Sequence, residues 1–420
     1  MKDRILKYWK NLGPGLVSGA ADDDPSGIAT YSQTGAKYGF NFLWLSFFSL
    51  PFMIVVQEMC ARIGLVTGKG LTANIKANYS KKVLYVCGFL LLFANTFNIG
   101  ADLGAMAQGV QLIFPDFNFI LLVIFFAVFS LCFQIFVSYK TYAKFLKYLT
   151  FALFSYIISS LLINIDWREA LKHTFIPSFS LTKDSVLLVC AILGTTISPY
   201  LFFWQTSQEV EEHITPSGIV SRDKEKTIKK HIRIMRTDVF SGMFFSNLVM
   251  FFIIIACAGT LFKNGITDIT SAAQAAQALR PFAGDLSYFL FAVGIIGTGL
   301  LAIPVLAGSA SYVIAETFDF KEGLFRKWYE AKLFYGVMIL AVGLGILFNF
   351  IGFDPMKALF YSALLNGLTA PVVIYFIVRL SSNDKVMGNF KNKTTYKIIG
   401  WTTFVLMSIV AMLAIFYLWI

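Results

Sequence analysis

Long apolar stretches separated by short polar links form the dominant pattern of this chain. Crossing a hydrocarbon core of ~30 Å takes about 20 helical residues, and stretches of that length recur eleven times. The pattern therefore predicts an all-α polytopic membrane protein with 11 transmembrane helices. The expected spans are 13–38, 40–65, 84–112, 117–138, 145–164, 186–208, 237–262, 286–315, 333–350, 356–378 and 398–420.

Composition supports a membrane protein and narrows its partners. Of the 420 residues 57% are hydrophobic and 14% charged, and the mean hydropathy is +0.69. A soluble protein of this size could not hide so much apolar surface. The formal charge of +11 comes from Lys and Arg in the short links, which argues against a nucleic-acid partner. All five cysteines lie in expected spans without CxxC spacing, so neither a disulfide framework nor a zinc site is supported.

The distribution of basic residues predicts the orientation. Of the 35 Lys and Arg residues, seven fall in one set of alternate links and the others fall in the opposite set. Cytoplasmic links carry the excess of positive charge. The N-terminus is therefore expected in the cytoplasm and the C-terminus outside, in a membrane that we take to be a bacterial plasma membrane. The most basic link, SRDKEKTIKKHIRIMR, could bind lipid or a partner, but a solvated positive-inside loop is the favoured interpretation.

Three adjacent carboxylates interrupt the first expected span at Asp22, Asp23 and Asp24, followed by Pro25-Ser26-Gly27. Each charged side chain deep in a bilayer costs about 2.5 to 3.5 kcal/mol on insertion scales. Such residues persist where they face protein, water or a cation. The small apolar run before them and the helical pattern after them predict a helix broken around a binding site.

A second interruption lies in the sixth expected span, where polar and helix-breaking residues run from Gly194 to Tyr200 around Pro199. A proline kink alone could explain it. Breaks at matching places in two five-span halves, however, indicate a transporter with inverted repeats whose site lies where the breaks meet. The chain is thus expected to form one domain over 1–420, with repeats at approximately 13–164 and 186–378 and an additional helix at 398–420.

The two breaks offer carboxylates and backbone carbonyls, which are hard oxygen ligands suited to Mg²⁺, Ca²⁺, Mn²⁺ or Na⁺. Neither break contains Met, Cys or His, and the three histidines lie outside the expected spans. Small residues such as Gly27 and Ser198 around an acidic centre suit Mg²⁺, which retains its water. We find no GxSxG, HExxH or Walker pattern, so the protein is not expected to be an enzyme and no cofactor is implied.

Other ionisable residues within the expected spans are few. The Asp102 carboxylate could face the binding site expected at the two breaks, or it could be satisfied by a hydrogen bond between helices. Glu58 and Arg62 are spaced as i and i+4, which predicts a structural ion pair. Asp238 and Glu316 lie at expected cytoplasmic ends of spans, where they are interpreted as gate or snorkelling residues.

Several segments resemble the Nramp family of divalent metal transporters over nearly the whole chain. GPGLVSGAADDDPSG resembles the family's first span, with its Asp-Pro-Gly-Asn motif. QEMCARIGLVTGKGL, GADLGAMAQG, GTTISPY and TDVFSGMFFSNLV resemble the second, third, sixth and seventh spans. The resemblance implies a LeuT-type fold, with helices 1 and 6 broken.

The departures from the family pattern concern its metal ligands. Asp24 matches the family's Asp, whereas Gly27 replaces its metal-binding Asn. Thr195 stands at the Ala whose carbonyl reaches the metal. Ser198 stands at the Met whose thioether selects Mn²⁺ and Fe²⁺ over alkaline-earth ions, so the resemblance implies that this discrimination is lost.

Positions associated in the family with proton movement also differ. Tyr200 and Gln205 occupy the places of two span-6 histidines, and Ala105 replaces a span-3 Glu, while Asp102 is retained. This pattern is most similar to the Nramp-related magnesium transporters, which carry Mg²⁺ and Mn²⁺ without clear proton coupling.

The expected function is therefore alternating-access transport of Mg²⁺, and also Mn²⁺, without proton coupling. The metal site would use Asp24, Gly27, Thr195 and Ser198. Asp22 and Asp23 could hold metal-bound water in an outer shell, and Asp102, Tyr200 and Gln205 could line the pathway. The alternatives are a proton-coupled Mn²⁺/Fe²⁺ importer of the conventional Nramp type and, from another class, a sodium-coupled carrier of an organic solute. The expected partners are the metal ion and the lipid bilayer, and a monomer is expected.

Overall fold

The computed structural model describes residues 8–9, 12–179, 181–213, 225–267, 269, 272–351 and 355–419. These residues form α-helices and short 3-10 helices, with no strand among them. The elements are α2 Pro14–Asp22, α3 Pro25–Tyr38, α4 Trp44–Phe48, α5 Leu50–Thr67, α6 Leu71–Asn78, α7 Lys81–Ile113, α8 Phe119–Phe136, α9 Tyr139–Leu149, η1 Thr150–Leu153, α10 Phe154–Leu161, α11 Trp167–Phe175, α12 Lys183–Thr196, α13 Pro199–Glu212, α14 Glu225–Thr260, η2 Phe262–Asn264, α15 Ala272–Phe318, α16 Lys332–Phe350, α17 Pro355–Ser381, α18 Asp384–Met387, η3 Gly388–Phe390 and α19 Thr394–Trp419.

The expected number of eleven spans is not confirmed. Within the described parts of the chain, nine helical segments are long and apolar enough to cross a membrane. The expected span 13–38 is not among these nine: it is divided into α2 and α3, and every stretch of membrane-spanning length within it contains the three carboxylates Asp22, Asp23 and Asp24. The expected span 145–164 is likewise divided, among α9, η1 and α10.

The seventh expected span begins much earlier than the sequence pattern indicates. The expected limits were 237–262, whereas α14 begins at Glu225. Its first turns contain no Gly or Pro before Ser241 and are rich in Lys, Arg, Glu and Ile, most of which are good helix formers. The basic residues assigned to a solvated link therefore extend the helix beyond its apolar part.

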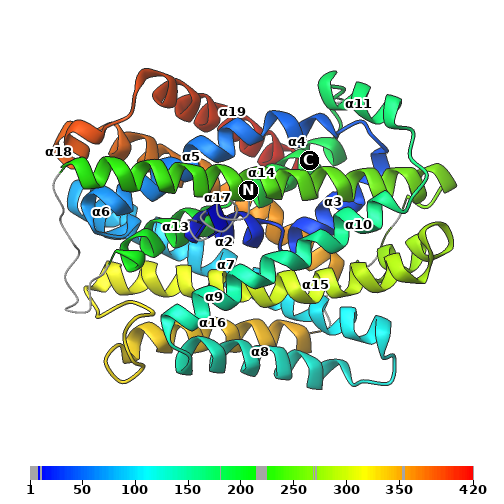
Figure 1. Ribbon diagram of the computed structural model, residues 1–420, viewed down its shortest axis with the longest axis horizontal. Helices are drawn as coiled ribbons and strands as arrows, with labels where there is room; N and C mark the ends of the chain where they lie inside the picture. Colours follow the sequence, from blue (N-terminus) through cyan, green and yellow to red (C-terminus); the bar gives the residue numbers. More distant parts are fainter. Residues whose placement is uncertain are drawn as a thin grey trace.

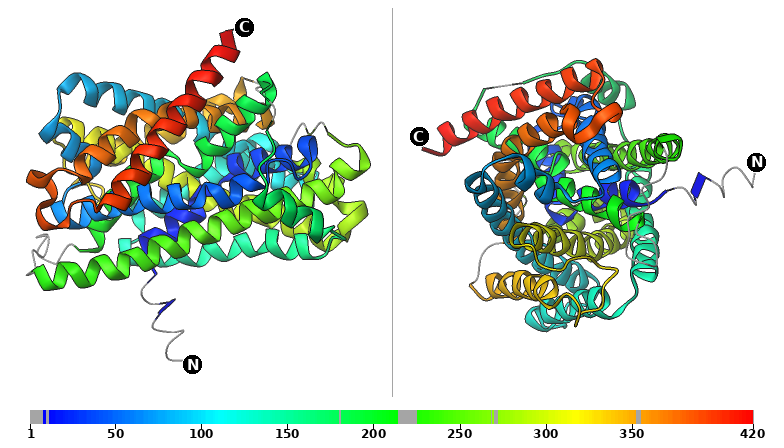
Figure 2. Two further views of the ribbon diagram at one scale, coloured as in Figure 1. Left: turned by 90° about the horizontal axis from the view of Figure 1, so that it is seen from above. Right: turned by 90° about the vertical axis from the view of Figure 1, so that its left-hand side faces the viewer.

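The two helices that carry the sequence-predicted breaks, α2–α3 and α12–α13, lie inside the bundle, and the long apolar helices surround them (Figure 1). In the most apolar part of Lys183–Glu212, which holds α12 and α13, 89% of the residues are buried, compared with 28% for α19. In Figure 2, α19 crosses the outside of the bundle and its C-terminal end extends away from its neighbours. The outer helices α8, α16 and α19 carry exposed Phe, Leu and Ile side chains, as expected for surfaces that face lipid.

Small residues allow the interrupted helices to pack closely against their neighbours. A Cβ atom on Gly19 of α2 would lie 2.2 Å from the carbonyl oxygen of Gly242 on α14. A Cβ atom on Gly194 of α12 would lie 2.1 Å from the carbonyl oxygen of Ala363 on α17. Close backbone approach through small residues is a common way to pack membrane helices, and here it holds both broken helices near the centre.

Candidate metal-binding site at the two helix breaks

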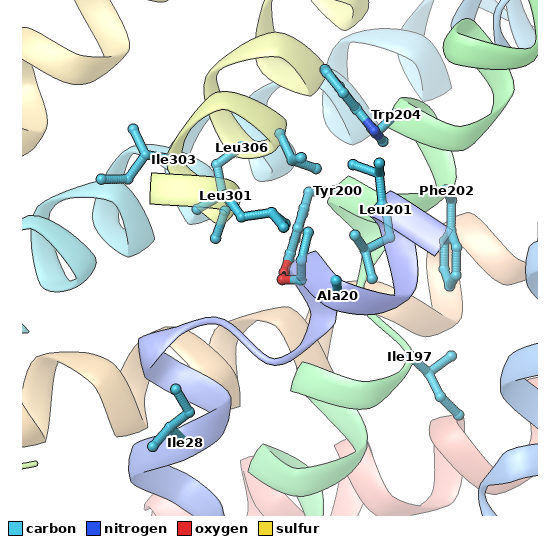
Figure 3. Packing of buried hydrophobic residues seen from close by; sticks show 14 of the residues in the cluster. Ala20, Ile28, Ile197, Tyr200, Leu201, Phe202, Trp204, Leu301, Ile303 and Leu306 are labelled. Carbon is cyan, nitrogen blue, oxygen red and sulfur yellow. Dashed lines mark hydrogen bonds between the residues drawn. The ribbon is translucent and has the colours of Figure 1, made fainter. Parts of the chain in front are cut away.

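The structure has both interruptions where the sequence predicts them. Helix α2 ends at Asp22 and α3 begins at Pro25. Helix α12 ends at Thr196 and α13 begins at Pro199. In each case proline occupies the first turn of the second helix, where its missing N–H would have no partner in the helix. The two interruptions face one another in Figure 3, where the ring of Tyr200 points towards the bend between α2 and α3.

Asp24 is held in place by three hydrogen-bond donors. As the N-cap of α3, its Oδ1 accepts hydrogen bonds from the backbone N–H of Gly27 at 2.7 Å and from the Ser26 hydroxyl at 2.6 Å. Its Oδ2 accepts a hydrogen bond from Asn98 Nδ2 on α7 at 2.8 Å. A carboxylate at a helix N-terminus is also stabilised by the helix dipole. The Asp24 side chain is therefore held in one orientation at the first break.

Asp22 and Asp23 have a less favourable environment. Both are fully buried at the C-terminal end of α2, where the helix dipole disfavours negative charge. Asp22 Oδ2 accepts a hydrogen bond from the Ser246 hydroxyl at 2.7 Å. Asp22 Oδ1 and both carboxylate oxygens of Asp23 accept no hydrogen bond from the described residues. Positive charge nearby would compensate these oxygens.

Gly27 lies where the two interruptions touch. A Cβ atom at this position would be 2.9 Å from Thr195 Oγ1 and 3.1 Å from the carbonyl oxygen of Asp22. The Thr195 hydroxyl donates to that carbonyl oxygen at 3.3 Å. The hydroxyl of Thr195 thus occupies the space that a side chain at residue 27 would need.

Ser198 and Tyr200 organise backbone carbonyls around the breaks. The Ser198 hydroxyl hydrogen-bonds with the carbonyl oxygens of Gly194 at 2.6 Å and Thr195 at 2.7 Å. The Tyr200 hydroxyl donates to the carbonyl oxygen of Ala21 at 2.8 Å. Carbonyls at the C-terminal ends of α2 and α12, which lack partners within their own helices, are thereby gathered at one place.

Gln205 lies one turn or more away from the second break, in a buried polar chain. It accepts hydrogen bonds from the Ser18 hydroxyl at 2.7 Å and from Gln57 Nε2 at 3.3 Å. Its own amide donates to Glu209 at 2.9 Å. Gln205 therefore connects α2, α5 and α13 and belongs to the surroundings of the site.

Asn98 is the residue at the first break that the sequence interpretation missed. It precedes Asp102 by four residues on α7, so both lie on the same face of that helix. Asn98 Oδ1 and both oxygens of Asp102 are buried and accept no hydrogen bond from the described residues. The i, i+4 spacing of two polar residues within an apolar span was the signal that could have identified Asn98.

The carboxylates do not form a compact ligand cage. Nowhere in the described ranges do three His, Cys, Asp or Glu side chains come together closely enough to hold a metal ion. The site instead combines the Asp24 carboxylate with carbonyl and hydroxyl oxygens. These are the ligand types that hard divalent cations accept, and a cation that retains water needs few of them from protein.

The ionisable residues near the ends of the spans have structural partners. Glu58 and Arg62 form the expected ion pair at 3.0 Å, and Arg236 also contacts Glu58 at 2.8 Å. The interpretation of Asp238 as a snorkelling residue is wrong, because its carboxylate is buried and accepts backbone hydrogen bonds at the N-terminus of α2. Glu316 is also buried and accepts from the backbone N–H of Ala73 at 2.7 Å.

Comparison with solved structures shows the fold. The chain superposes on the Eremococcus coleocola manganese transporter with a TM-score of 0.80 and 20% identity, covering 97% of this chain and 86% of that one. It also matches the inward-facing conformation of Mhp1 with a TM-score of 0.56 and 13% identity, covering 97% and 90% of the two chains. The LeuT-type architecture implied by the sequence resemblance is therefore confirmed.

Sequence comparisons identify the family. The chain is 25% identical to the divalent metal cation transporter MntH of Caldanaerobacter subterraneus over 403 residues, covering 94% of this chain and 90% of the relative. It is 25% identical to MntH of Bacillus subtilis, covering 94% and 89%. The family model described as natural resistance-associated macrophage protein-like matches residues 15–417. The protein therefore belongs to the Nramp family of divalent metal transporters.

Proposed function

We propose that this protein carries Mg²⁺, and also Mn²⁺, across the membrane by alternating access and without proton coupling. The observation that carries the proposal is the donor set at the two breaks, which consists of carboxylate, carbonyl and hydroxyl oxygens. Ser198 uses its hydroxyl to hold carbonyls of α12 and supplies no sulfur. Hard oxygen ligands favour Mg²⁺, Ca²⁺ and Mn²⁺, whereas thioether sulfur favours softer ions.

Asp24 is the principal ligand in this proposal. Its carboxylate is already oriented by Ser26, Gly27 and Asn98, so little rearrangement is needed to present its remaining lone pairs to a cation. The carbonyl groups near Asp22 and Thr195 would supply further oxygens. Absence of a side chain at Gly27 leaves no amide ligand there, and a water molecule on the ion would take that role.

Asp22 and Asp23 would act at a greater distance. Their buried, incompletely satisfied oxygens would hold water bound to the ion. In the same proposal Asp102 and Tyr200 lie beside the pathway. The inverted repeats at approximately 13–164 and 186–378 would provide the alternating movement, as is general for transporters with paired broken helices.

A second candidate is a conventional proton-coupled importer of Mn²⁺ or Fe²⁺. The names of the relatives favour it, because the two bacterial relatives are divalent metal cation transporters and the solved structure is that of a manganese transporter. The third alternative, a sodium-coupled carrier of an organic solute, has no support, because this protein belongs to a family of divalent metal transporters.

Uptake into proteoliposomes distinguishes the two candidates. With Mg²⁺ and pH indicators inside, the proposal expects Mg²⁺ uptake that Mn²⁺ inhibits and no acidification of the lumen. Asp24→Asn keeps the shape of the side chain and should reduce uptake at least about tenfold, since it removes a charged ligand. The exposed Asp184→Asn is the matched control. Mn²⁺-dependent acidification with no Mg²⁺ uptake would establish the conventional importer instead.

A further inference from the structure

A pocket of about 650 Å³ lies where the first turns of α14 meet the segment that joins α18 to α19. None of the described residues that line it is acidic. Its cationic lining residues are Arg62 of α5, Lys229, Arg233 and Arg236 of α14, and Lys391 and Lys393 of the segment before α19.

The positive charge of this pocket is only partly neutralised. Glu58 contacts both Arg62 and Arg236, so one carboxylate serves two guanidinium groups. Lys391 is paired with Asp384 at 2.7 Å. Arg233 is exposed and has no acidic partner within hydrogen-bonding distance among the described residues. The pocket therefore keeps a net positive charge and guanidinium groups that can donate to an anion.

The wall provided by α14 changes from cationic to apolar along one face. Arg233, Thr237, Phe240 and Phe244 follow one another at spacings of three or four residues, which places them in one stripe on the helix. Phe240 is 52% exposed and Phe244 is 47% exposed, and their rings stack with centroids 6.0 Å apart. An anionic group in the pocket would thus have an apolar surface directly beside it.

We propose that this pocket binds the phosphate-bearing headgroup of an anionic membrane lipid, with an acyl chain lying along Phe240 and Phe244. Free inorganic phosphate has the same phosphate chemistry, but it has no apolar part that could contact the adjoining apolar stripe. In the orientation predicted from the basic links, the pocket lies at the cytoplasmic side, where basic pockets between membrane helices bind anionic headgroups. The sequence alone favoured a solvated loop, because it did not show that these residues continue α14.

A bound lipid would join parts of the structure that are already connected through Arg62. The Arg62 guanidinium donates to the carbonyl oxygen of Phe390 and to Asn392 Oδ1, which ties α5 to the segment before α19. A headgroup held by Arg233 and Lys393 would tie α14 to the same segment. The lipid is therefore expected to raise the melting temperature of the protein.

Native mass spectrometry of the full-length protein in neutral detergent tests the proposal. The probe is an equimolar mixture of dioleoylphosphatidylglycerol and dioleoylphosphatidylcholine. We expect the protein to retain phosphatidylglycerol, the anionic lipid, in preference to phosphatidylcholine. Two headgroup contacts are removed by R233A combined with K393A, which should weaken retention about 30-fold.

The matched control is K230A combined with K397A. It removes two exposed lysines from α14 and α19, outside the pocket, and should leave retention within about threefold of the parent because screened charges act over short distances. Equal loss in both double variants would overturn the proposal, as would equal retention in all three proteins. Melting temperatures without lipid verify folding, and the single variants R233Q and K393Q replace the double variant if it is unstable. Displacement of the lipid by millimolar inorganic phosphate with the same thermal shift would assign the pocket to a free anion and overturn the lipid.

Discussion

Asn98 Nδ2 donates a hydrogen bond to Asp24 Oδ2 at 2.8 Å. This bond joins the middle of α7 to the break between α2 and α3. The other oxygen of Asp24 serves as the N-cap of α3, so the two oxygens have different tasks. Oδ1 caps the N-terminus of α3, and Oδ2 holds α3 against α7 through Asn98.

Replacing Asn98 with Ala is expected to disturb the candidate ligand without touching its charge. Loss of a buried hydrogen bond to a carboxylate should lower the free energy of unfolding by about 1.5 to 3 kcal/mol and reduce metal uptake, because Asp24 can then rotate. Asn95→Ala is the control, since Asn95 lies on the same helix and bonds to Leu306 and Ser309. Equal uptake by the two variants in proteoliposomes would contradict the role of Asn98.

The buried pair of Glu58 and Arg62 is expected to respond much more strongly to mutation than the exposed pair of Lys37 and Asp184. The side chains of Glu58 and Arg62 are 2% and 3% exposed, and those of Lys37 and Asp184 are 49% and 61% exposed. Glu58→Gln leaves a buried guanidinium without a full counter-charge and should cost about 3 to 5 kcal/mol. Asp184→Asn should cost at most about 1 kcal/mol. Chemical unfolding in mixed micelles measures both, and similar costs would refute this ranking.

The interruptions were predictable from sequence because they violate the apolar pattern, and a carboxylate or proline within a span is visible without a structure. The positions of the two breaks are confirmed, whereas the assignment of Asp24, Gly27, Thr195 and Ser198 as metal ligands stays a prediction. Asn98 was missed because its i, i+4 spacing with Asp102 does not by itself reveal the contact with Asp24, which joins residues 74 positions apart. The same limit explains why snorkelling was considered for Asp238, whose interpretation as a gate residue stays a prediction. Its partners lie on α2, more than 220 residues away.

Glu322 is expected to make stability depend on pH. It lies between α15 and α16, and burial together with the charges of Glu316 and Glu211 raises its pKa from 4.5 to about 10. Between these values the folded protein holds a proton that the unfolded chain releases, so stability should fall as the pH rises through this window. Glu322→Gln should flatten that decline.

The measurement is the melting temperature of the parent and of Glu322→Gln at several pH values between about 5 and 9, which lie between the two pKa values. Glu330→Gln is the control because Glu330 is an exposed acid of the same connecting segment. If the variant lacking the Glu322 carboxyl and the parent lose stability equally with rising pH, the assignment of this dependence to Glu322 is wrong.

Asp238 is expected to control opening of the first half-helix. Its carboxylate accepts backbone hydrogen bonds from Gly13 at 2.8 Å, Gly15 at 2.7 Å and Leu16 at 3.0 Å, so α14 supplies the N-terminal cap that α2 lacks. Asp238→Asn removes the charge and one acceptor. We expect hydrogen exchange in residues 12–22 to become about tenfold faster, which corresponds to a loss of about 1.4 kcal/mol. The neighbouring Thr237→Ala should leave this exchange unchanged, and an unchanged rate in both variants would show that the cap is dispensable.

Gly27 and Thr195 are expected to be energetically coupled, since a methyl group at residue 27 and the Thr195 hydroxyl require the same space. Gly27→Ala alone should lower the free energy of unfolding by about 1 to 3 kcal/mol through overpacking, because the new Cβ would lie 2.9 Å from Thr195 Oγ1. Thr195→Ala removes that oxygen and loses one hydrogen bond of 3.3 Å, at a cost of about 0.5 to 1.5 kcal/mol. The double variant should therefore be more stable than the sum of the two losses predicts, by about 1 kcal/mol. Thr196→Ala provides the comparison, because the Thr196 hydroxyl bonds within α12 to Ile192 and should show no coupling to Gly27→Ala. Strict additivity for the Thr195 pair would mean that the two breaks do not compete for space at this contact.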